Sequence, residues 1–458
     1  MNAFSRRGAC PALSAPMQTG DGLLVRLNPV AGGLSPKSLI GLGESALRHG
    51  NGIMEVTARG SLQIRGLTAE SALQLATEVD ALGIAVRSGV PVETGPLAGA
   101  DPQEATDPRP LADLVRTAIE DAGLATRLGP KVSVVIDGGG QLTLDAVTAD
   151  VRLRAVQAGR DTLWSVSVAG DARSARPLAT VNENAARDIA VAALRMVAEK
   201  GREAHTRDLS QRQINSLASW HSVAPLSVLP DISPSEGDMS GRTERGASRK
   251  PIGFFPLADD TFALGIGLPF GSMPAQNVID LASQASNLGA TEIRLAPGRA
   301  LLFLDLSPSA SASLQATAAA LGFVTTTTDP RTRIAACPGT PACASGRIAT
   351  RAIAETIAKE SVDLFDASLS LHISGCAKGC AHPGAAAITL VGDENGAGLV
   401  VDGTAKALPA GYRPGYDAAR GVAVIASTIR RERRPGETAA ACLSRLGAAG
   451  IAELYRRD

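Results

Sequence analysis

Four cysteines in the last third of the chain have the type and spacing that can bind an inorganic cluster. They form two pairs, Cys337-Pro-Gly-Thr-Pro-Ala-Cys343 and Cys376-Ala-Lys-Gly-Cys380. Gly, Pro and Ala surround both pairs, and such residues let the backbone turn tightly and approach a bulky group closely. Because a cubane cluster needs one soft thiolate for each iron, the two loops together predict a 4Fe-4S site.

Two other interpretations of these cysteines stay open. Structural zinc also takes four cysteines, but its usual pairs are separated by about two to four residues, and the first spacing here is wider. The thiols could instead be free, since cysteine is often buried as a small hydrophobic residue. The remaining two cysteines, Cys10 and Cys442, stand alone and are expected to be isolated thiols.

Two histidines flank the second cysteine pair, His372 and His382. Imidazole is a common ligand of mononuclear iron, so either one is a candidate ligand of a mononuclear non-haem iron. The alternative is structural: His372 would lie on a core strand, and His382 would hydrogen-bond within its own loop.

Composition excludes several classes of partner. The chain has 458 residues, enough for two to four domains, and carries 45 basic and 45 acidic side chains with only 3% aromatics. Neither a charged nucleic-acid surface nor a base-stacking platform is expected. No apolar run reaches the length of a membrane span, and no signal-peptide core follows the N-terminus. We therefore expect a cytoplasmic protein with reduced thiols and no membrane partner.

The elements that position the cysteines begin with a compact unit near the N-terminus. A strand at 23–28 precedes a helix that starts at Ser35-Pro36 and stops at Gly50, with apolar residues at helical spacing. Two short strands then form a hairpin-like pair around Arg59-Gly60, and a helix over 69–81 follows.

This unit recurs later in the chain. Five landmarks return after a displacement of 238 or 239 residues: Gly33, Pro36, Leu42, Gly50 and Gly60 correspond to Gly271, Pro274, Leu281, Gly289 and Gly298. So long a period indicates duplicated domains. Residues 95–101 then lie where 337–343 lie in the second copy, and only the second copy has cysteines. We expect two equivalent halves that both contribute to a central cavity.

The cysteine motif, with the strand Ala387-Ile-Thr-Leu-Val-Gly after it, resembles the sulfite and nitrite reductase family. In that family a 4Fe-4S cluster is joined to sirohaem through the last cysteine of the motif, here Cys380. The segments 374–383 and 6–16 are more similar to one branch, the precorrin-3B synthases of aerobic cobalamin biosynthesis.

The resemblance implies an α+β fold made of duplicated ferredoxin-like half-domains and two sulfite-reductase-type cluster- or haem-binding lobes. The expected division is a first ferredoxin-like repeat at 20–90, a first lobe at 91–220, a linker at 221–250, a second repeat at 251–326 and a cluster lobe at 327–458. Ser, Pro, Gly and charged residues dominate the linker.

The resemblance also implies which residues bind the substrate carboxylates. The element Thr57-Ala-Arg59-Gly-Ser-Leu-Gln63 matches the family's pattern, and the other expected residues are Arg26, Arg65 and Lys131. Two departures from the reductases are Ser133, in place of a second lysine, and Lys378, between the last two cysteines. Fewer fixed cations weaken capture of a small oxyanion, and Lys378 should raise the cluster potential.

By this resemblance the reaction is the oxidation of precorrin-3A by dioxygen, with hydroxylation and lactone formation, using an external electron donor such as NAD(P)H through a separate reductase. The catalytic residues and the oxygen site are not identified by the sequence. The main alternative is a sirohaem-dependent sulfite or nitrite reductase. A tetrapyrrole carrier without enzymatic activity is a further alternative.

Overall fold

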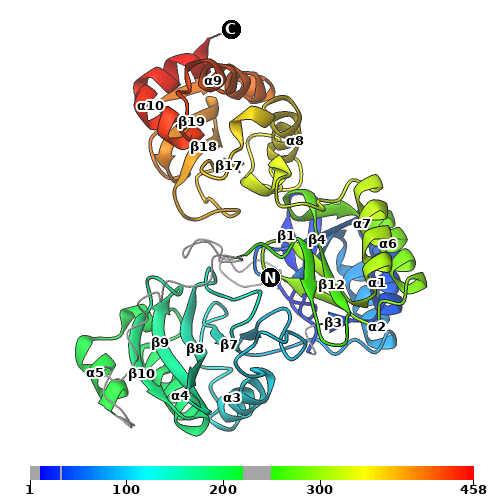
Figure 1. The fold of residues 1–458 in the computed structure, drawn as a ribbon, viewed down its shortest axis with the longest axis vertical. Coiled ribbons are helices and arrows are strands. Elements are labelled where there is room, and N and C mark those ends of the chain that lie inside the picture. Colours follow the sequence, from blue (N-terminus) through cyan, green and yellow to red (C-terminus); the bar gives the residue numbers. More distant parts are fainter. Residues whose placement is uncertain (1–10, 31–32, 220–248, 458) are drawn as a thin grey trace.

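The computed structural model describes residues 11–30, 33–219 and 249–457. In this part of the chain the strands form four sheets of five strands each. Two sheets lie together in a central body, and each of the other two belongs to a separate lobe (Figure 1). Cys10, the segment 6–10 and nearly all of the predicted linker lie outside the described residues.

The first central sheet contains the strands and helices predicted for the N-terminal unit. Helix α1 begins after Ser35, whose hydroxyl accepts a hydrogen bond from the Ser38 N–H at 3.0 Å, and it ends before Gly50 as expected. The sheet order is β1 (Met17–Thr19), β2 (Gly22–Leu27), β5 (Leu62–Leu67), β4 (Ile53–Val56) and β13 (Ser272–Pro274), and its helices are α1 (Pro36–His49) and α2 (Ala69–Ala81).

The second central sheet repeats this order and confirms the internal repeat. Its strands are β11 (Gly253–Pro256), β12 (Phe262–Gly267), β15 (Ala300–Leu306), β14 (Ile293–Ala296) and β3 (Gly33–Leu34), and its helices are α6 (Ala275–Asn287) and α7 (Pro308–Ala320). Each half lends one edge strand to the other sheet, because β13 pairs with β4 and β3 pairs with β14. The helix expected from Pro274 starts one residue later, since Pro274 ends β13.

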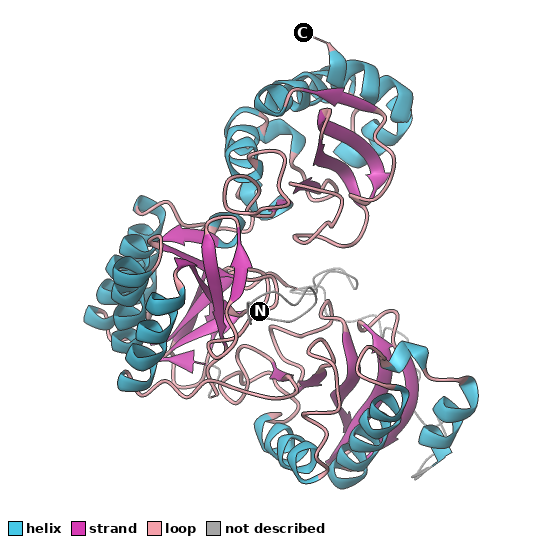
Figure 2. Ribbon diagram, turned by 180° about the vertical axis from the view of Figure 1, so that it is seen from behind, coloured by secondary structure: helices cyan, strands magenta, loops and turns pink. Residues whose placement is uncertain are grey.

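The helices of both halves cover one side of the two sheets, as Figure 2 shows. Apolar residues from both sheets and their helices form one shared core, including the fully buried Leu42, Ile64, Leu281 and Phe303. The opposite faces of the sheets are therefore free to meet the two lobes.

The lobes are also copies of one another. The first has strands β6 (Val92–Thr94), β7 (Val134–Asp137), β8 (Ala149–Ala158), β9 (Asp161–Gly170) and β10 (Arg176–Val181), with helices α3 (Arg109–Asp121), α4 (Glu183–Lys200) and α5 (Gln211–Ser219). The second has β16 (Ile334–Ala336), β17 (Leu371–Ser374), β18 (Ala386–Asp393), β19 (Gly396–Gly403) and β20 (Gly411–Arg413), with α8 (Thr350–Glu360), α9 (Ala418–Glu432) and α10 (Ala439–Arg456). Short 3₁₀ turns are η1 (Thr206–Asp208), η3 (Pro269–Gly271), η4 (Pro330–Arg333), η5 (Val362–Leu364) and η6 (Gly415–Asp417).

In each lobe the first three strands are parallel and the remaining pairings are antiparallel. The loop after β6 therefore corresponds to the loop after β16, as the sequence predicted for 95–101 and 337–343. The boundaries given above for the five segments stay a prediction. No helix among the described residues is long and apolar enough to cross a membrane.

The lobes pack crosswise on the central body. Leu97 and Leu142 of the first lobe enter an apolar cluster with Phe255 and Leu302 of the second sheet. The cluster lobe instead meets the first sheet, where Ala342 O accepts hydrogen bonds from Gly20 N and Arg65 Nη2. Each half thus supports the lobe of the other half.

Candidate active site

A cavity of about 1180 Å³ lies between the first sheet and the cluster lobe. Its walls contain all four cysteines of the two predicted cluster loops. The five predicted substrate-binding residues also line it: Arg26, Arg59, Gln63, Arg65 and Lys131. Segments far apart in the sequence therefore meet at one place, although the roles of these residues remain predictions.

Glycines bring the two cysteine loops into direct backbone contact. A Cβ atom added to Gly346 would lie 2.8 Å from the carbonyl carbon of Gly339, and one added to Gly375 would lie 3.2 Å from the Cα atoms of Gly339 and Gly346. Gly339 also has a φ of 63°, which favours glycine. Side chains at these positions would force the loops apart, so the glycines set the spacing of the cysteine pairs.

The other three cysteines act electrostatically on the Cys380 thiol. Burial raises the pKa of Cys380, and the neighbouring Cys337, Cys376 and Cys343 raise it further, while Lys378 lowers it. Cys337 Sγ accepts a hydrogen bond from Gly375 N at 3.2 Å. Lys378 Nζ donates to Ser345 Oγ at 2.7 Å and so joins the two loops. Four close thiolates need positive charge, which an iron–sulfur cluster would supply.

The donor set fits a cluster better than a single ion. Within the described ranges no three His, Cys, Asp or Glu side chains converge on a position for one metal ion. Zinc would need four sulfurs around one centre, whereas a cubane takes one thiolate at each iron and spreads them apart. The cysteines Cys337, Cys343, Cys376 and Cys380 are the residues that would hold it.

A polar row crosses the face of the first sheet toward the cavity. Arg26, Gln63 and Glu55 are register partners on β2, β5 and β4. With its amide oxygen toward Arg26, Gln63 accepts from Nε and Nη2 at 3.3 and 3.0 Å and donates to Glu55 at 3.3 Å. Gln63 and Glu55 are buried, so this row forms a pre-arranged polar floor.

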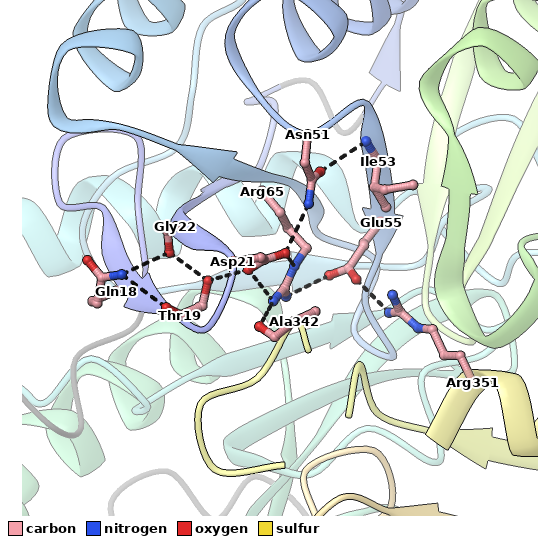
Figure 3. A network of polar contacts seen from close by, with 10 residues as sticks. All are labelled: Gln18, Thr19, Asp21, Gly22, Asn51, Ile53, Glu55, Arg65, Ala342 and Arg351. Atoms are coloured by element: carbon pink, nitrogen blue, oxygen red, sulfur yellow. Dashed lines mark hydrogen bonds and ion pairs between the residues drawn. The ribbon is translucent and has the colours of Figure 1, made fainter. Parts of the chain in front are cut away.

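Arg65 is tied into a network rather than left open to the cavity (Figure 3). Its guanidinium donates twice to Asp21 at 3.0 Å, and it also reaches Glu55 at 3.4 Å and Ala342 O at 2.6 Å. Glu55 also accepts from Arg351 Nη2 at 2.5 Å. This network joins the first sheet to the loop that carries Cys343.

The other predicted residues occupy the rim and the side of the first lobe. Arg59 is exposed and donates to the Thr148 carbonyl, and Lys131 is exposed as well. Ser133, at the place of the reductases' second lysine, is buried and does not line the cavity.

Three charged cavity residues were not singled out from the sequence: Glu55, Arg299 and Arg351. Arg299 follows Gly298, which is the equivalent of Gly60 in the first copy. Because the turn at Gly60 contains the predicted binding residue Arg59, the internal repeat indicates the turn at Gly298 as a further candidate. Glu55 and Arg351 gave no local signal, because they pair across 296 positions of the sequence.

The two histidines lie beside the cysteine loops but do not line the cavity. Their ring centroids are 5.8 Å apart. His372 is fully buried on β17, neither ring nitrogen has a hydrogen-bond partner among the described residues, and burial lowers its pKa to about 4. His382 Nε2 lies 3.1 Å from the Ala385 carbonyl, as the structural alternative predicted.

Comparisons with known proteins identify relatives of this chain. Residues 15–82 match the family model of the nitrite/sulfite reductase ferredoxin-like half domain. An assimilatory ferredoxin-dependent nitrite reductase of Haloferax mediterranei is 23% identical, covering 81% of this chain and 70% of its own. A ferredoxin–nitrite reductase of Synechococcus elongatus is 25% identical, covering 86% and 81%. The solved Mycobacterium tuberculosis NirA shares the fold, with a TM-score of 0.70 at 17% identity over 94% of this chain and 84% of that one.

A higher similarity is found to a precorrin-3B synthase of Sinorhizobium sp. The identity is 39% over 455 residues, which covers 99% of this chain and 96% of that relative. Both the N-terminal unit and the cysteine loops fall within this match. This chain therefore belongs to the precorrin-3B synthase family, a branch of the nitrite and sulfite reductases.

Proposed function

We propose that the protein is an oxidoreductase that converts precorrin-3A to precorrin-3B in aerobic cobalamin biosynthesis. The observation that carries this proposal is the 39% identity to a precorrin-3B synthase over nearly the whole chain. One atom of dioxygen would hydroxylate the meso carbon between rings A and D, and the ring A acetate would close a lactone. The other oxygen atom would leave as water, with two electrons and two protons from an external donor such as NAD(P)H acting through a reductase.

The cavity has the size and charge for a tetrapyrrole with many carboxylates. Its volume of about 1180 Å³ exceeds the roughly 300–1000 Å³ of ordinary small-molecule pockets. We assign carboxylate binding to Arg26, Arg59 and Lys131, and orientation of Arg26 to Gln63. Arginine forks and lysine suit carboxylates through charge-assisted hydrogen bonds. Arg65 would contribute positive charge to substrate binding while it stays hydrogen-bonded to Asp21 and Glu55.

We propose that Cys337, Cys343, Cys376 and Cys380 hold a 4Fe-4S cluster, which would supply single-electron transfer. Lys378 and its bond to Ser345 would raise the cluster potential and keep the two loops together. A mononuclear non-haem iron near His372 and His382 remains a finer prediction. The reducing cytoplasm would keep the thiolates available for iron.

The alternative is a sirohaem-dependent nitrite or sulfite reductase, which the matches to two nitrite reductases favour. In that case the macrocycle would be a resident cofactor in the same cavity. The buried Ser133, in place of a lysine, reduces the positive charge available for a small oxyanion.

An anaerobic purification separates these possibilities. The synthase should show cluster absorption with about four iron and four sulfide per chain and no sirohaem bands. Precorrin-3A, a chemical reductant and ¹⁸O-labelled dioxygen should then give a product that gains one labelled oxygen atom by mass spectrometry. Stoichiometric sirohaem with nitrite reduction would support the alternative, and unchanged precorrin-3A would indicate a carrier.

A further inference from the structure

The turn that carries Arg299 is built to hold a positive charge at the cavity wall. Arg299 has a φ of 68°, a left-handed conformation that is unusual for a bulky residue. Its Nη2 donates to the Ala381 carbonyl, next to Cys380, at 2.9 Å. Gly271 leaves room for this side chain, because an added Cβ would lie 2.9 Å from Arg299 Cδ. Backbone strain and clearance together direct this arginine toward the cluster lobe.

Arg299 lies beside a second positive charge. In the described part of the chain no carboxylate forms an ion pair with it, and the charged neighbour that acts on it is another cation, Arg351. Burial lowers the pKa of Arg299, and Arg351 lowers it further. A partly buried cation beside a second cation is costly unless an anion joins them.

Arg351 lies on helix α8 of the cluster lobe. One of its nitrogens, Nη2, is bound to Glu55 at 2.5 Å, while its Nε is buried and has no hydrogen-bond partner in the structure. About 25% of the side chain remains accessible, and it lines the same cavity as Arg299. Part of its hydrogen-bonding capacity is therefore unused.

We infer that Arg299 and Arg351 form a second anion-binding site in this cavity, which takes one carboxylate of a tetrapyrrole in addition to those bound by Arg26 and Arg59. The inference rests on the proposed function, since it assigns further contacts to the same substrate class. A carboxylate would accept hydrogen bonds from both guanidinium groups and offset their repulsion. The site would orient the macrocycle relative to Cys380 by fixing one edge at the cluster lobe.

Uroporphyrin III, a stable polycarboxylate tetrapyrrole, is the probe for this site. Its affinity for the cluster-loaded, anaerobic protein can be measured by equilibrium dialysis at several salt concentrations. We expect Arg299→Gln to weaken binding about tenfold and to reduce the salt dependence, and Arg351→Gln to weaken it less because Arg351 is shared with Glu55. Since both contact one carboxylate, the double variant should lose less than the product of the two effects.

Two further variants make the test decisive. Arg299→Lys keeps the charge and should recover part of the affinity, whereas Arg420→Gln removes an exposed charge on α9 and should change nothing. Unchanged affinity in both Arg299→Gln and Arg351→Gln, with iron content and thermal midpoint preserved, would overturn the inference. So would a lowered cluster potential with unchanged affinity in Arg299→Gln, because Arg299 would then serve the cluster.

The outcome is separable from the proposed function. If the wild-type protein oxidises precorrin-3A but Arg299→Gln alters neither probe affinity nor KM, only the second site fails. If Arg299-dependent binding persists without any oxidation of precorrin-3A, the anion site stands and the proposed reaction fails.

Discussion

The two central sheets have the same strand order, but the faces that they turn toward the lobes differ in polarity. The polar row of the first sheet is Arg26, Gln63 and Glu55. The equivalent row of the second sheet, 239 residues later, is Gly265, Leu302 and Arg294, and we call it the apolar row because Leu302 is at its centre. The first row faces the cavity. Leu302 is fully buried against Leu97 and Leu142 of the first lobe.

The difference shows how one copy of a duplicated fold becomes a site. The apolar face of the second sheet packs directly against an apolar loop, so no cavity is left there. The polar face of the first sheet borders a cavity, where its polar side chains can bind a ligand. Both lobes are nevertheless held by an arginine of the opposite half. Arg294 donates to Ala98 O at 2.9 Å in the first lobe, and Arg65 donates to Ala342 O at 2.6 Å in the cluster lobe.

Removing one cluster ligand should produce the largest change in iron and sulfide content, and it should affect only the lobe that packs on the polar face of the first sheet. Cys380→Ser is expected to eliminate most of the bound iron and sulfide, because an iron would lose its thiolate. Absorption and metal counts measure this loss. Cys442→Ser, at a buried cysteine outside the site, is the control and should keep the cluster. Full cluster content in Cys380→Ser would contradict the assignment.

Breaking the ionic network should destabilise the interface of the cluster lobe. Arg65→Met leaves Asp21 without its bidentate partner and weakens the contacts of Glu55 and Ala342. Removing one partner of a buried pair costs about 3–5 kcal/mol, so we expect a lower thermal midpoint and lower iron content. The matched control is Leu304→Met, at the equivalent position of the apolar sheet, where the expected cost is below about 1.5 kcal/mol. Equal effects of the two changes would refute the asymmetry.

The sequence could predict those parts of the molecule that have local signals. Ser35 and Gly50 bound α1 as expected, and the landmarks around Gly60 and Gly298 revealed the duplication. The spacing of the cysteines pointed to a cluster. In contrast, the exchange of β3 and β13 involves strands too short to show a periodicity.

The ionic contacts of the site were hidden for a different reason. Arg65 and Ala342 are 277 positions apart, and only the crosswise packing of the lobes brings them together. The sequence pattern around a single basic residue on a strand is the same whether that residue binds a ligand or a distant backbone carbonyl. The duplication could still have located Arg299, because it follows the glycine that matches Gly60.

Replacing Leu302 of the second sheet with glutamine, the residue at the equivalent position 63 of the first sheet, should have an intermediate effect on stability. Leu302→Gln places an amide among the apolar side chains around Leu97, with Arg294 as its register partner on β14. We expect a loss of about 2–4 kcal/mol in unfolding free energy, from lost apolar burial and the cost of transferring an amide out of water. Thermal unfolding measures the loss, and cluster content should stay unchanged. Leu114→Gln, at an exposed leucine of the first lobe, should be nearly neutral.

The smallest effect is expected at Glu104, in the loop of the first lobe that corresponds to the cysteine loop. Burial raises the pKa of Glu104 from 4.5 to about 7, and Asp101, Asp107 and Asp137 add to the rise, although the Gly99 N–H opposes it. The folded protein therefore holds a proton more tightly than the unfolded chain. The stabilising contribution of the protonated Glu104 carboxyl is complete below about pH 4.5 and is lost as the pH rises through 7.

Because Glu104 is only half-buried, solvent screening limits this contribution to about 1–2 kcal/mol. Glu104→Gln keeps the protonated shape without the titration, so its thermal midpoint should fall less than that of the wild-type protein between pH 5 and 7.5. Glu199→Gln, at an exposed glutamate of the same lobe, should leave the pH dependence as it is. If Glu104→Gln and the wild type show the same slope, the acidic loop of the first lobe titrates normally, and its difference from the cysteine loop is one of metal ligation alone.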